Sequence, residues 1–147
     1  MSRPIVVING PNLNRLGQRE PGVYGAETLN QINTRISERA ARHGIPIEFF
    51  QSNLEGALID RIHGASGALG VIFNPGGYSH TSVALRDAVA SIAAPVVEVH
   101  MTNIHAREEF RHQSLISGAC RGVITGLGAD GYLYAVDYIA SVSQTAP

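Results

Sequence analysis

Lysine is absent from this chain of 147 residues, and all eleven of its basic residues are arginine. Schiff-base catalysis on a carbonyl substrate needs a lysine amine, so that mechanism is excluded. The absence also excludes a P-loop and an enzyme that holds pyridoxal phosphate through a lysine. Any chemistry at this chain's site must therefore use other side chains.

Cysteine, charge and long apolar runs are also scarce. Cys120 is the single cysteine, which excludes an internal disulfide, fits a reducing cytoplasm and favours a role as a small buried hydrophobe. Only 16% of residues are charged and the net charge is −1, so no basic surface for nucleic acid is predicted. No apolar run is long enough to span a bilayer, and residues 1–4 lead directly into a strand-like run, so we expect neither a membrane span nor a signal peptide.

Three common site motifs are missing or misplaced. No G-x-S-x-G nucleophile elbow is present. Histidines and glutamates gather at residues 100–112, but without the H-E-x-x-H spacing of a zinc site, and we expect residues 106–112 to form a solvated helical face. Gly126–Gly131 matches G-x-G-x-x-G, yet only sixteen residues follow it, too few for a second strand with a ribose-binding acid. We interpret these glycines as a tight turn with close helix–strand packing.

What is present is a regular alternation of strand and helix in a chain that is 44% hydrophobic. The strand-like runs are mostly continuous and rich in Val, Ile and Phe, as in a parallel sheet buried on both faces; they are Pro4–Ile8, Pro46–Gln51, Leu69–Phe73, Pro95–Val99 and Arg121–Thr125. The apolar spacing between and after them predicts helices at Thr28–His43, Leu54–Gly64, Thr81–Ala94 and Asp130–Ser143. We therefore predict one three-layer α/β domain over residues 1–147.

Details of these helices can also be predicted. Gly44 is expected to end the first helix, and either Ser52 or Asn53 to cap the second. The third is expected to bury four apolar side chains, those of Val83, Ala84, Ala88 and Ile92, and to be stopped by Pro95.

The long segment from Asn9 to Gly25 follows the first strand and is unusually polar. Connections between a strand and a helix usually take about 2 to 6 residues, and longer ones are commonly lids or binding loops. This one carries groups for hydrogen bonding and charge rather than packing, namely Asn9, Asn12, Asn14, Arg15, Arg19 and Tyr24. In an open α/β sheet ligands bind beyond the carboxyl ends of the strands, where this loop would lie.

Two other strand ends are rich in side chains suited to acid–base work. The third strand leads into Asn74–His80, and the fourth into Glu98–His105. Glu98 and His100 are two residues apart on a strand, so both side chains point to the same face. The carboxylate could hold one ring nitrogen and leave the other free to move a proton, whereas His43 and His63 are expected to be structural.

These observations indicate an acid–base site that needs no metal, cofactor or lysine. Tyr24 could remove a proton next to a carbonyl if a positive neighbour such as Arg19 stabilised its phenolate. Backbone amides beyond the fourth strand could take an anionic group, and Arg111 could bind polar substrate oxygens.

The chain resembles the type II 3-dehydroquinate dehydratases along essentially its whole length. The resemblance is carried by Asn9-Gly-Pro-Asn-Leu-Asn14, by Arg19-Glu-Pro and Tyr24-Gly25, by the run Asn74-Pro-Gly-Gly-Tyr-Ser-His80 through Asp87, by Glu98-Val-His100, by Asn103–Arg111 and by Gly126-Leu-Gly128. It implies a flavodoxin-like fold with a five-stranded parallel sheet of order 2-1-3-4-5, and a homododecamer built from trimers. It also implies removal of water from 3-dehydroquinate to give 3-dehydroshikimate, without a cofactor, in aromatic amino-acid biosynthesis or quinate catabolism.

The resemblance assigns a role to each matching residue. Tyr24 would be the base, assisted by Arg19, and His100, oriented by Glu98, would be the acid. Asn12 would hold a water that stabilises the enolate. The remaining residues would bind substrate: Asn74, His80 and Arg111 its hydroxyls, the backbone amides of Met101 and Thr102 its carboxylate, and Asp87 from near a trimer contact. Leu or Ile followed by Ser is commoner in the family at 101 and 102, a change that backbone contacts survive.

Two other functions also fit the pattern. One is a flavodoxin-like binding or regulatory domain in which Tyr24 and His100 only hold a ligand. The other is a different lyase or isomerase that uses the same enolate chemistry on another polyhydroxylated acid.

Overall fold

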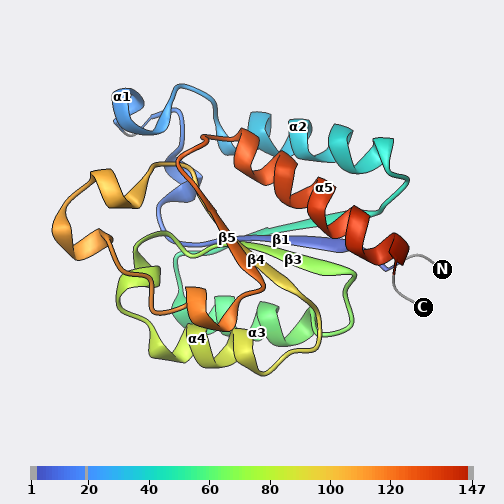
Figure 1. Cartoon of the computed structure of the whole chain (residues 1–147). Coiled ribbons are helices and arrows are strands. Elements are labelled where there is room, and N and C mark those ends of the chain that lie inside the picture. The colour runs from blue at the N-terminus through green and yellow to red at the C-terminus, as the bar shows by residue number, and fades with distance from the viewer. Residues whose placement is uncertain (1–2, 19, 146–147) are drawn as a thin grey trace.

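The computed structural model describes residues 3–18 and 20–145. Five parallel strands form one sheet in the order β2-β1-β3-β4-β5, with β1 at Ile5–Asn9, β2 at Ile47–Gln51, β3 at Gly70–Asn74, β4 at Val96–His100 and β5 at Gly122–Thr125. Helices α2 (Leu29–Arg42) and α5 (Asp130–Thr145) cover one face, and α3 (Glu55–Gly64) and α4 (Val83–Ala90) cover the other (Figure 1). The predicted three-layer fold and its strand order are confirmed. No described helix is long and apolar enough to cross a membrane.

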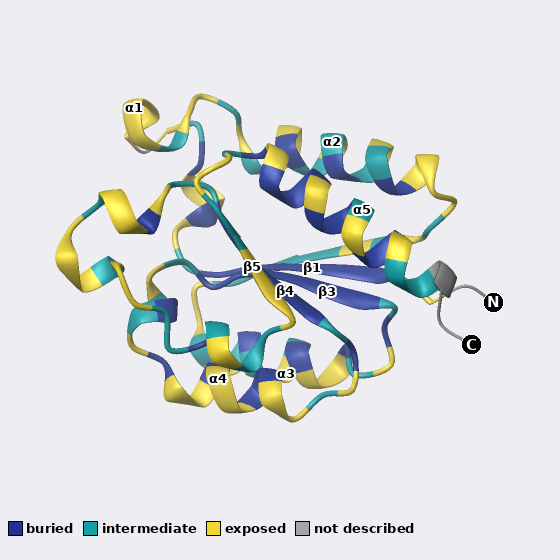
Figure 2. Ribbon diagram, viewed as in Figure 1, coloured by how far each residue is buried: buried dark blue, intermediate teal, exposed yellow. Residues whose placement is uncertain are grey.

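The central strands are buried on both faces, as their continuous apolar sequences predict. Every residue of β1, β3 and β4 is buried, whereas the edge strands β2 and β5 are partly exposed (Figure 2). Alternate side chains enter two separate cores: Val7 and Ile72 pack on the α2–α5 side, and Ile8 and Phe73 on the α3–α4 side. The strands thus form a rigid base whose carboxyl ends all lie at one edge.

The helix ends follow local capping chemistry, with one departure from the predicted caps. Thr28 and Gln31 form a capping box at the start of α2, and Gly44 follows that helix with a φ of +68°. Neither Ser52 nor Asn53 caps α3, whose N-cap is Leu54. Asn53 instead accepts a hydrogen bond from the backbone N–H of Asn12 at 3.0 Å, so its side chain serves the long loop after β1.

Helix α4 is shorter than predicted and turns a different face to the sheet. Ser82 caps it by accepting a hydrogen bond from the backbone N–H of Leu85 at 2.9 Å, so the helix begins at Val83 rather than Thr81. Leu85, Ala88 and Val89 then form the buried face. The predicted burial of Val83 and Ala84 is wrong, because both lie at the start of the helix, before its buried residues, and are exposed. Ile92 lies after the end of the helix and is half-buried.

The stretch after β4 also differs from the prediction. Residues 106–112 do not form one helix but parts of two short 3₁₀ turns, η3 (Ile104–Ala106) and η4 (Glu109–Arg111). The turn at Gly126 and Gly128 is confirmed, since both have positive φ angles of +90° and +61°. A Cβ on Gly131 would lie 3.2 Å from Ile124, which confirms close packing of α5 on β5.

Candidate active site

The ends of β1 and β3 are locked together at the middle of the sheet. The backbone N–H of Gly10 donates to the carbonyl of Asn74 at 2.7 Å, and a Cβ on Gly10 would lie only 2.5 Å from the carbonyl oxygen of Pro75. The chain proceeds from β1 to β2 in one direction and reaches β3 on the other side, so these ends form the topological switch point of the sheet. A binding site is expected directly beyond them.

A cavity of about 160 Å³ lies there, beyond the ends of β1, β3 and β4. Eight residues predicted to form the site line it: Asn12, Tyr24, Asn74, His80, His100, Met101, Thr102 and Arg111. They come from three segments that are far apart in sequence, at and beyond the ends of β1, β3 and β4. The cavity therefore brings together most of the predicted site. Glu98 and Asp87 do not line it, and Arg19 lies outside the described residues.

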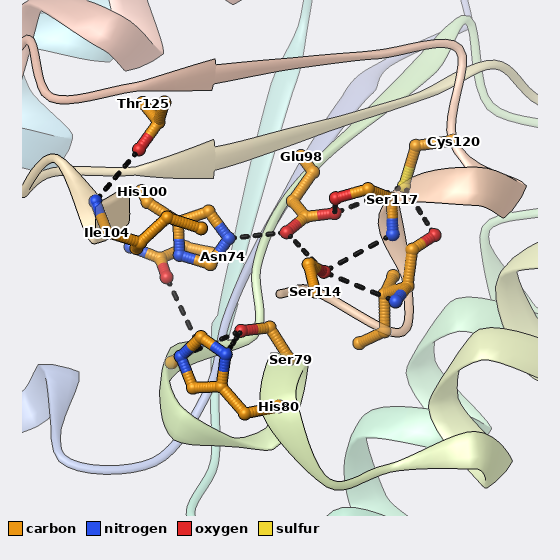
Figure 3. A network of polar contacts seen from close by, with 12 residues as sticks. Asn74, Ser79, His80, Glu98, His100, Ile104, Ser114, Ser117, Cys120 and Thr125 are labelled. Carbon is orange, nitrogen blue, oxygen red and sulfur yellow. Dashed lines mark hydrogen bonds and ion pairs between the residues drawn. The ribbon is translucent and has the colours of Figure 1, made fainter. Parts of the chain in front are cut away.

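Glu98 lies behind His100 and holds its ring. The two side chains share a face of β4, and Nε2 of His100 forms a hydrogen bond with Oε2 of Glu98 (Figure 3). Burial alone would raise the pKa of Glu98, but the hydrogen bond and charge of His100, with hydrogen bonds from Ser117 and Ser114, hold that pKa below its ordinary value. The carboxylate is ionised, which keeps a proton on Nε2 and leaves Nδ1 as the ring nitrogen for acid–base work. This contact is the one the two-residue spacing predicted.

His80 and Arg111 provide further polar groups at the cavity wall. The ring of His80 stacks near that of His100, with the two ring centroids 6.5 Å apart. Nδ1 of His80 forms a hydrogen bond with the carbonyl of Gln113 at 2.9 Å. Nε of Arg111 donates to Glu108 at 3.1 Å. Both side chains are thus held in place by their neighbours at the cavity wall.

A buried tyrosine that the sequence pattern did not single out sets the orientation of Asn74. The amide nitrogen of Asn74 donates to the hydroxyl of Tyr132 on α5 at 2.8 Å, and that hydroxyl donates to Oδ1 of Asn9 at 2.6 Å. The amide oxygen of Asn74 accepts from the N–H of Gly76 at 3.1 Å. A tyrosine on the apolar face of a helix needs a partner for its hydroxyl, which is the signal that could have indicated this network.

The long loop after β1 carries Tyr24 to the cavity. Within the loop lie a 3₁₀ turn, η1 (Leu13–Arg15), and the single-turn helix α1 (Pro21–Tyr24). The guanidinium of Arg107 lies over the Tyr24 ring, 5.2 Å from its centroid, and donates to the hydroxyl of Thr102 at 3.2 Å. Arg107, which also lines the cavity, was missed although it lies in the motif that ends at Arg111. Arg19 lies outside the described residues, so its help to Tyr24 stays a prediction.

The predicted binding residues in the turn after β4 lie at the cavity, whereas Asp87 does not. The carbonyls of Met101 and Thr102 accept hydrogen bonds from the N–H of Gly128 at 2.9 Å and the hydroxyl of Thr125 at 3.0 Å, which fix the turn beside the cavity. Asp87 does not line the cavity: its side chain is 65% exposed on α4, and its carboxylate pairs with Arg86. One chain thus brings the predicted binding residues together except Asp87.

Two remaining polar groups lie outside the cavity lining. His43 pairs with Asp137 at 2.8 Å between α2 and α5, in keeping with a structural role. Cys120, predicted to be buried, is only partly buried: it packs against the α3–α4 core, and its thiol also contacts Glu98 at 3.8 Å. Within the described ranges, no group of three or more His, Cys, Asp or Glu side chains is arranged to hold a metal ion.

Comparisons with known proteins give a consistent result. A family model described as dehydroquinase class II matches residues 3–140. A 3-dehydroquinate dehydratase of Desulforudis audaxviator is 58% identical over 130 residues, which are 88% of this chain and 87% of that protein. A catabolic 3-dehydroquinase of Penicillium rubens is 52% identical over 140 residues, 95% of this chain and 90% of the other. The crystal structure of the type II dehydroquinase from Propionibacterium acnes superposes with a TM-score of 0.92 at 42% identity, covering 96% of this chain and 98% of that one.

Proposed function

This chain belongs to the class II dehydroquinase family, and from that premise we propose which of its side chains carry each step. The reaction removes water from 3-dehydroquinate and gives 3-dehydroshikimate. The observation that supports the assignment most strongly is that Tyr24 and the Glu98–His100 pair meet at one cavity. A base and an acid at the same cavity are what an elimination through an enolate needs.

In the proposed mechanism Tyr24, as a phenolate, takes the proton from the carbon next to the ketone. The electrons of that C–H bond form an enolate, whose oxygen is stabilised by a water held by Asn12. The C–O bond then breaks as the enolate collapses, and His100 gives its Nδ1 proton to the departing hydroxyl, which leaves as water. The conjugated enone remains, and proton exchange with solvent restores phenolate and imidazolium.

The contacts around the cavity support these roles. The carboxylate of Glu98, whose pKa is held below its ordinary value, orients His100 through Nε2, so Nδ1 is the ring atom left to give a proton to the leaving hydroxyl. Arg19 is proposed to stabilise the phenolate of Tyr24, since a guanidinium cannot itself act as a competing base. Asn74, His80 and Arg111 are proposed to bind the substrate hydroxyls, and the amides of Met101 and Thr102 its carboxylate.

We also propose a homododecamer built from four trimers, in which Asp87 reaches the cavity of a neighbouring copy. Asp87 is exposed and lies outside its own cavity, so a role in binding needs a second chain. Val83, one turn earlier on α4, is 59% exposed, and nearby Leu54 is 69% exposed. An exposed apolar side chain one turn from Asp87 on the same helix fits a contact between copies. A cytoplasmic location, proposed from the single cysteine, would suit this enzyme.

An absorbance assay tests the activity directly. Adding 3-dehydroquinate to the protein should produce the ultraviolet absorbance of the conjugated enone product. Activity should survive a chelator, and also borohydride added with substrate, because neither a metal nor a lysine imine is part of the mechanism. A protein that only binds the compound would give no absorbance change, and an enzyme for another polyhydroxylated acid would respond to that acid in a substrate panel.

A further inference from the structure

The carboxylate of Glu98 is surrounded by hydrogen-bond donors from a segment that the proposed mechanism does not use. Glu98 is 0% exposed. The Ser114 hydroxyl donates to Oε2 at 2.8 Å, beside the bond from His100, while the Ser117 hydroxyl at 2.8 Å and the Cys120 thiol at 3.8 Å donate to Oε1 (Figure 3). Ser114, Ser117 and Cys120 lie in the connection between β4 and β5, around the 3₁₀ turn η5 (Ser117–Ala119). We call these three residues the carboxylate cradle.

We propose that Ser114 and Ser117 are positioning residues for the dehydration: they hold Glu98 ionised and in the orientation that keeps its bond to Nε2 of His100. This inference rests on the proposed role of His100 as the acid. A carboxylate removed from water is stable only when hydrogen bonds replace its hydration. His100 supplies one such bond, and the cradle supplies the others on both oxygens.

Apart from His100, the groups that face Glu98 are uncharged, and the two serine hydroxyls are the strongest hydrogen-bond donors among them. Burial, then the charge of Glu98 and the bond to it, raise the pKa of the Cys120 thiol to about 12, so the thiol stays protonated. Its single hydrogen is shared between Glu98 and the carbonyl of Ile116, 3.5 Å from the sulfur, so the thiol is the weakest donor of the cradle. The residues paired with Glu98 on the neighbouring strands are Phe73 and Val123, which carry no charge. His100 is the titratable side chain bonded to the carboxylate, and the ring of His80 stacks near that of His100.

The two serines differ in their contacts besides Glu98, and Ser117 is therefore the better residue to replace. The Ser114 hydroxyl also accepts from the backbone N–H groups of Ile116 and Ser117 at 3.2 and 3.3 Å, so it shapes the turn itself. The hydrogen bond found for the Ser117 hydroxyl runs to Glu98. Replacing Ser117 therefore changes the carboxylate with little effect on the backbone.

Loss of the Ser117 hydroxyl should affect one step of the reaction more than the other. With one donor fewer, the pKa of Glu98 rises and its carboxylate holds the His100 ring less firmly in place. Proton donation to the leaving hydroxyl then slows. Proton removal from the substrate is assigned to Tyr24 in another loop and should continue. A merely structural role for Ser117 would instead slow both steps together.

The test compares Ser117→Ala with Ser117→Thr, which keeps the hydroxyl, and with Ser91→Ala. Ser91 is a matched control because its hydroxyl donates to the carbonyl of Ala88 at 2.7 Å on α4, outside the cavity lining. In Ser117→Ala, kcat should fall about tenfold, since a hydrogen bond to a charged group is strong. KM and the exchange of the substrate proton with deuterated solvent should stay near wild type, Ser117→Thr should recover most of kcat, and Ser91→Ala should behave as wild type. Unchanged kcat in Ser117→Ala, or equal losses of turnover and exchange, would overturn the inference.

A second readout does not depend on turnover. Carbon-13 NMR of labelled glutamate should show the Glu98 carboxyl titrating at higher pH in Ser117→Ala than in the wild type or Ser91→Ala. An unmoved titration would overturn the inference even if kcat changed. Absence of dehydratase activity in the wild-type protein would instead contradict the proposed function, while this titration would still test the cradle.

Discussion

Tyr132, on helix α5 at the face of the sheet that α2 and α5 cover, sets the orientation in which Asn74 reaches the cavity. Burial, only partly opposed by the hydrogen bond from Asn74, raises the pKa of the Tyr132 hydroxyl well above its ordinary value. The hydroxyl therefore stays protonated, donates to Asn9 and accepts from the Asn74 amide nitrogen. With both partners fixed, the amide of Asn74 cannot rotate to exchange its nitrogen and oxygen.

Tyr132→Phe tests this network. The change keeps the ring but leaves buried polar atoms of Asn9 and Asn74 without their partner, so it should destabilise the fold by about 1–3 kcal/mol. The KM for substrate should rise, because the Asn74 amide becomes free to turn. Tyr138→Phe is the control, since its hydroxyl lies at the surface and accepts from Arg121 at 3.2 Å. Urea unfolding and steady-state kinetics measure both effects, and equal behaviour of the two variants would contradict the role of Tyr132.

For individual side chains, the sequence predicted contacts within one strand better than contacts between different elements. Glu98 and His100 lie two residues apart, so strand geometry alone placed them on one face. Tyr132 lies 58 residues from Asn74, and Ser117 lies 19 residues from Glu98. Their contacts depend on how helices and turns pack on the sheet, which a periodic pattern does not define.

Among the elements, strands were easier to predict than helix ends. Each strand lies within about one residue of its predicted run, because burial on both faces selects continuous apolar sequences. Helix α4 was predicted too long at both ends: the cap by Ser82 starts it at Val83, and it stops at Ala90, four residues before the predicted end at Ala94. Residues 106–112 were predicted as a helix, but they make short turns that bring Arg107 and Arg111 to the cavity.

The lock between the loops after β1 and β3 gives a prediction for these elements. Gly10→Ala would place a Cβ 2.5 Å from the carbonyl oxygen of Pro75, and backbone on both sides has little room to move. We expect a loss of about 1–3 kcal/mol in unfolding free energy, as for other overpacked sites, together with reduced activity.

Gly56→Ala is the matched control, because a Cβ there meets nothing within 4 Å and α3 should gain about 0.5–1 kcal/mol. Thermal or urea unfolding of the two variants provides the comparison. If Gly10→Ala were as stable as Gly56→Ala, the loops would not be locked in the way described.

For the whole molecule, the composition excluded lysine-dependent mechanisms, and the alternation of strands and helices predicted the layers. The sequence pattern could not show whether copies associate, because an apolar residue at a surface contact, such as Val83, cannot be distinguished from a core residue by its spacing. The prediction that Val83 is buried in its own chain was wrong. Its exposure beside Asp87 is what supports the proposed trimer.

Light scattering should detect a large oligomer built from trimers. Val83→Arg should produce smaller species and lower activity, because a charge at the contact excludes the neighbouring copy and removes its Asp87 from the cavity. Glu38→Arg, on the exposed side of α2 in the other helical layer, is the control for adding an arginine. A fully active monomer would contradict the proposal, as would an unchanged oligomer in Val83→Arg.

The assignment of Tyr24 as base and His100 as acid is tested most directly by NMR of deuterium exchange into 3-dehydroquinate. Tyr24→Phe keeps the ring but removes the phenol, so exchange of the substrate proton should fall by about 10²- to 10⁴-fold. His100→Ala should block loss of the hydroxyl while exchange continues at least in part. Exchange that persists in Tyr24→Phe and disappears in His100→Ala would show that the two roles are reversed.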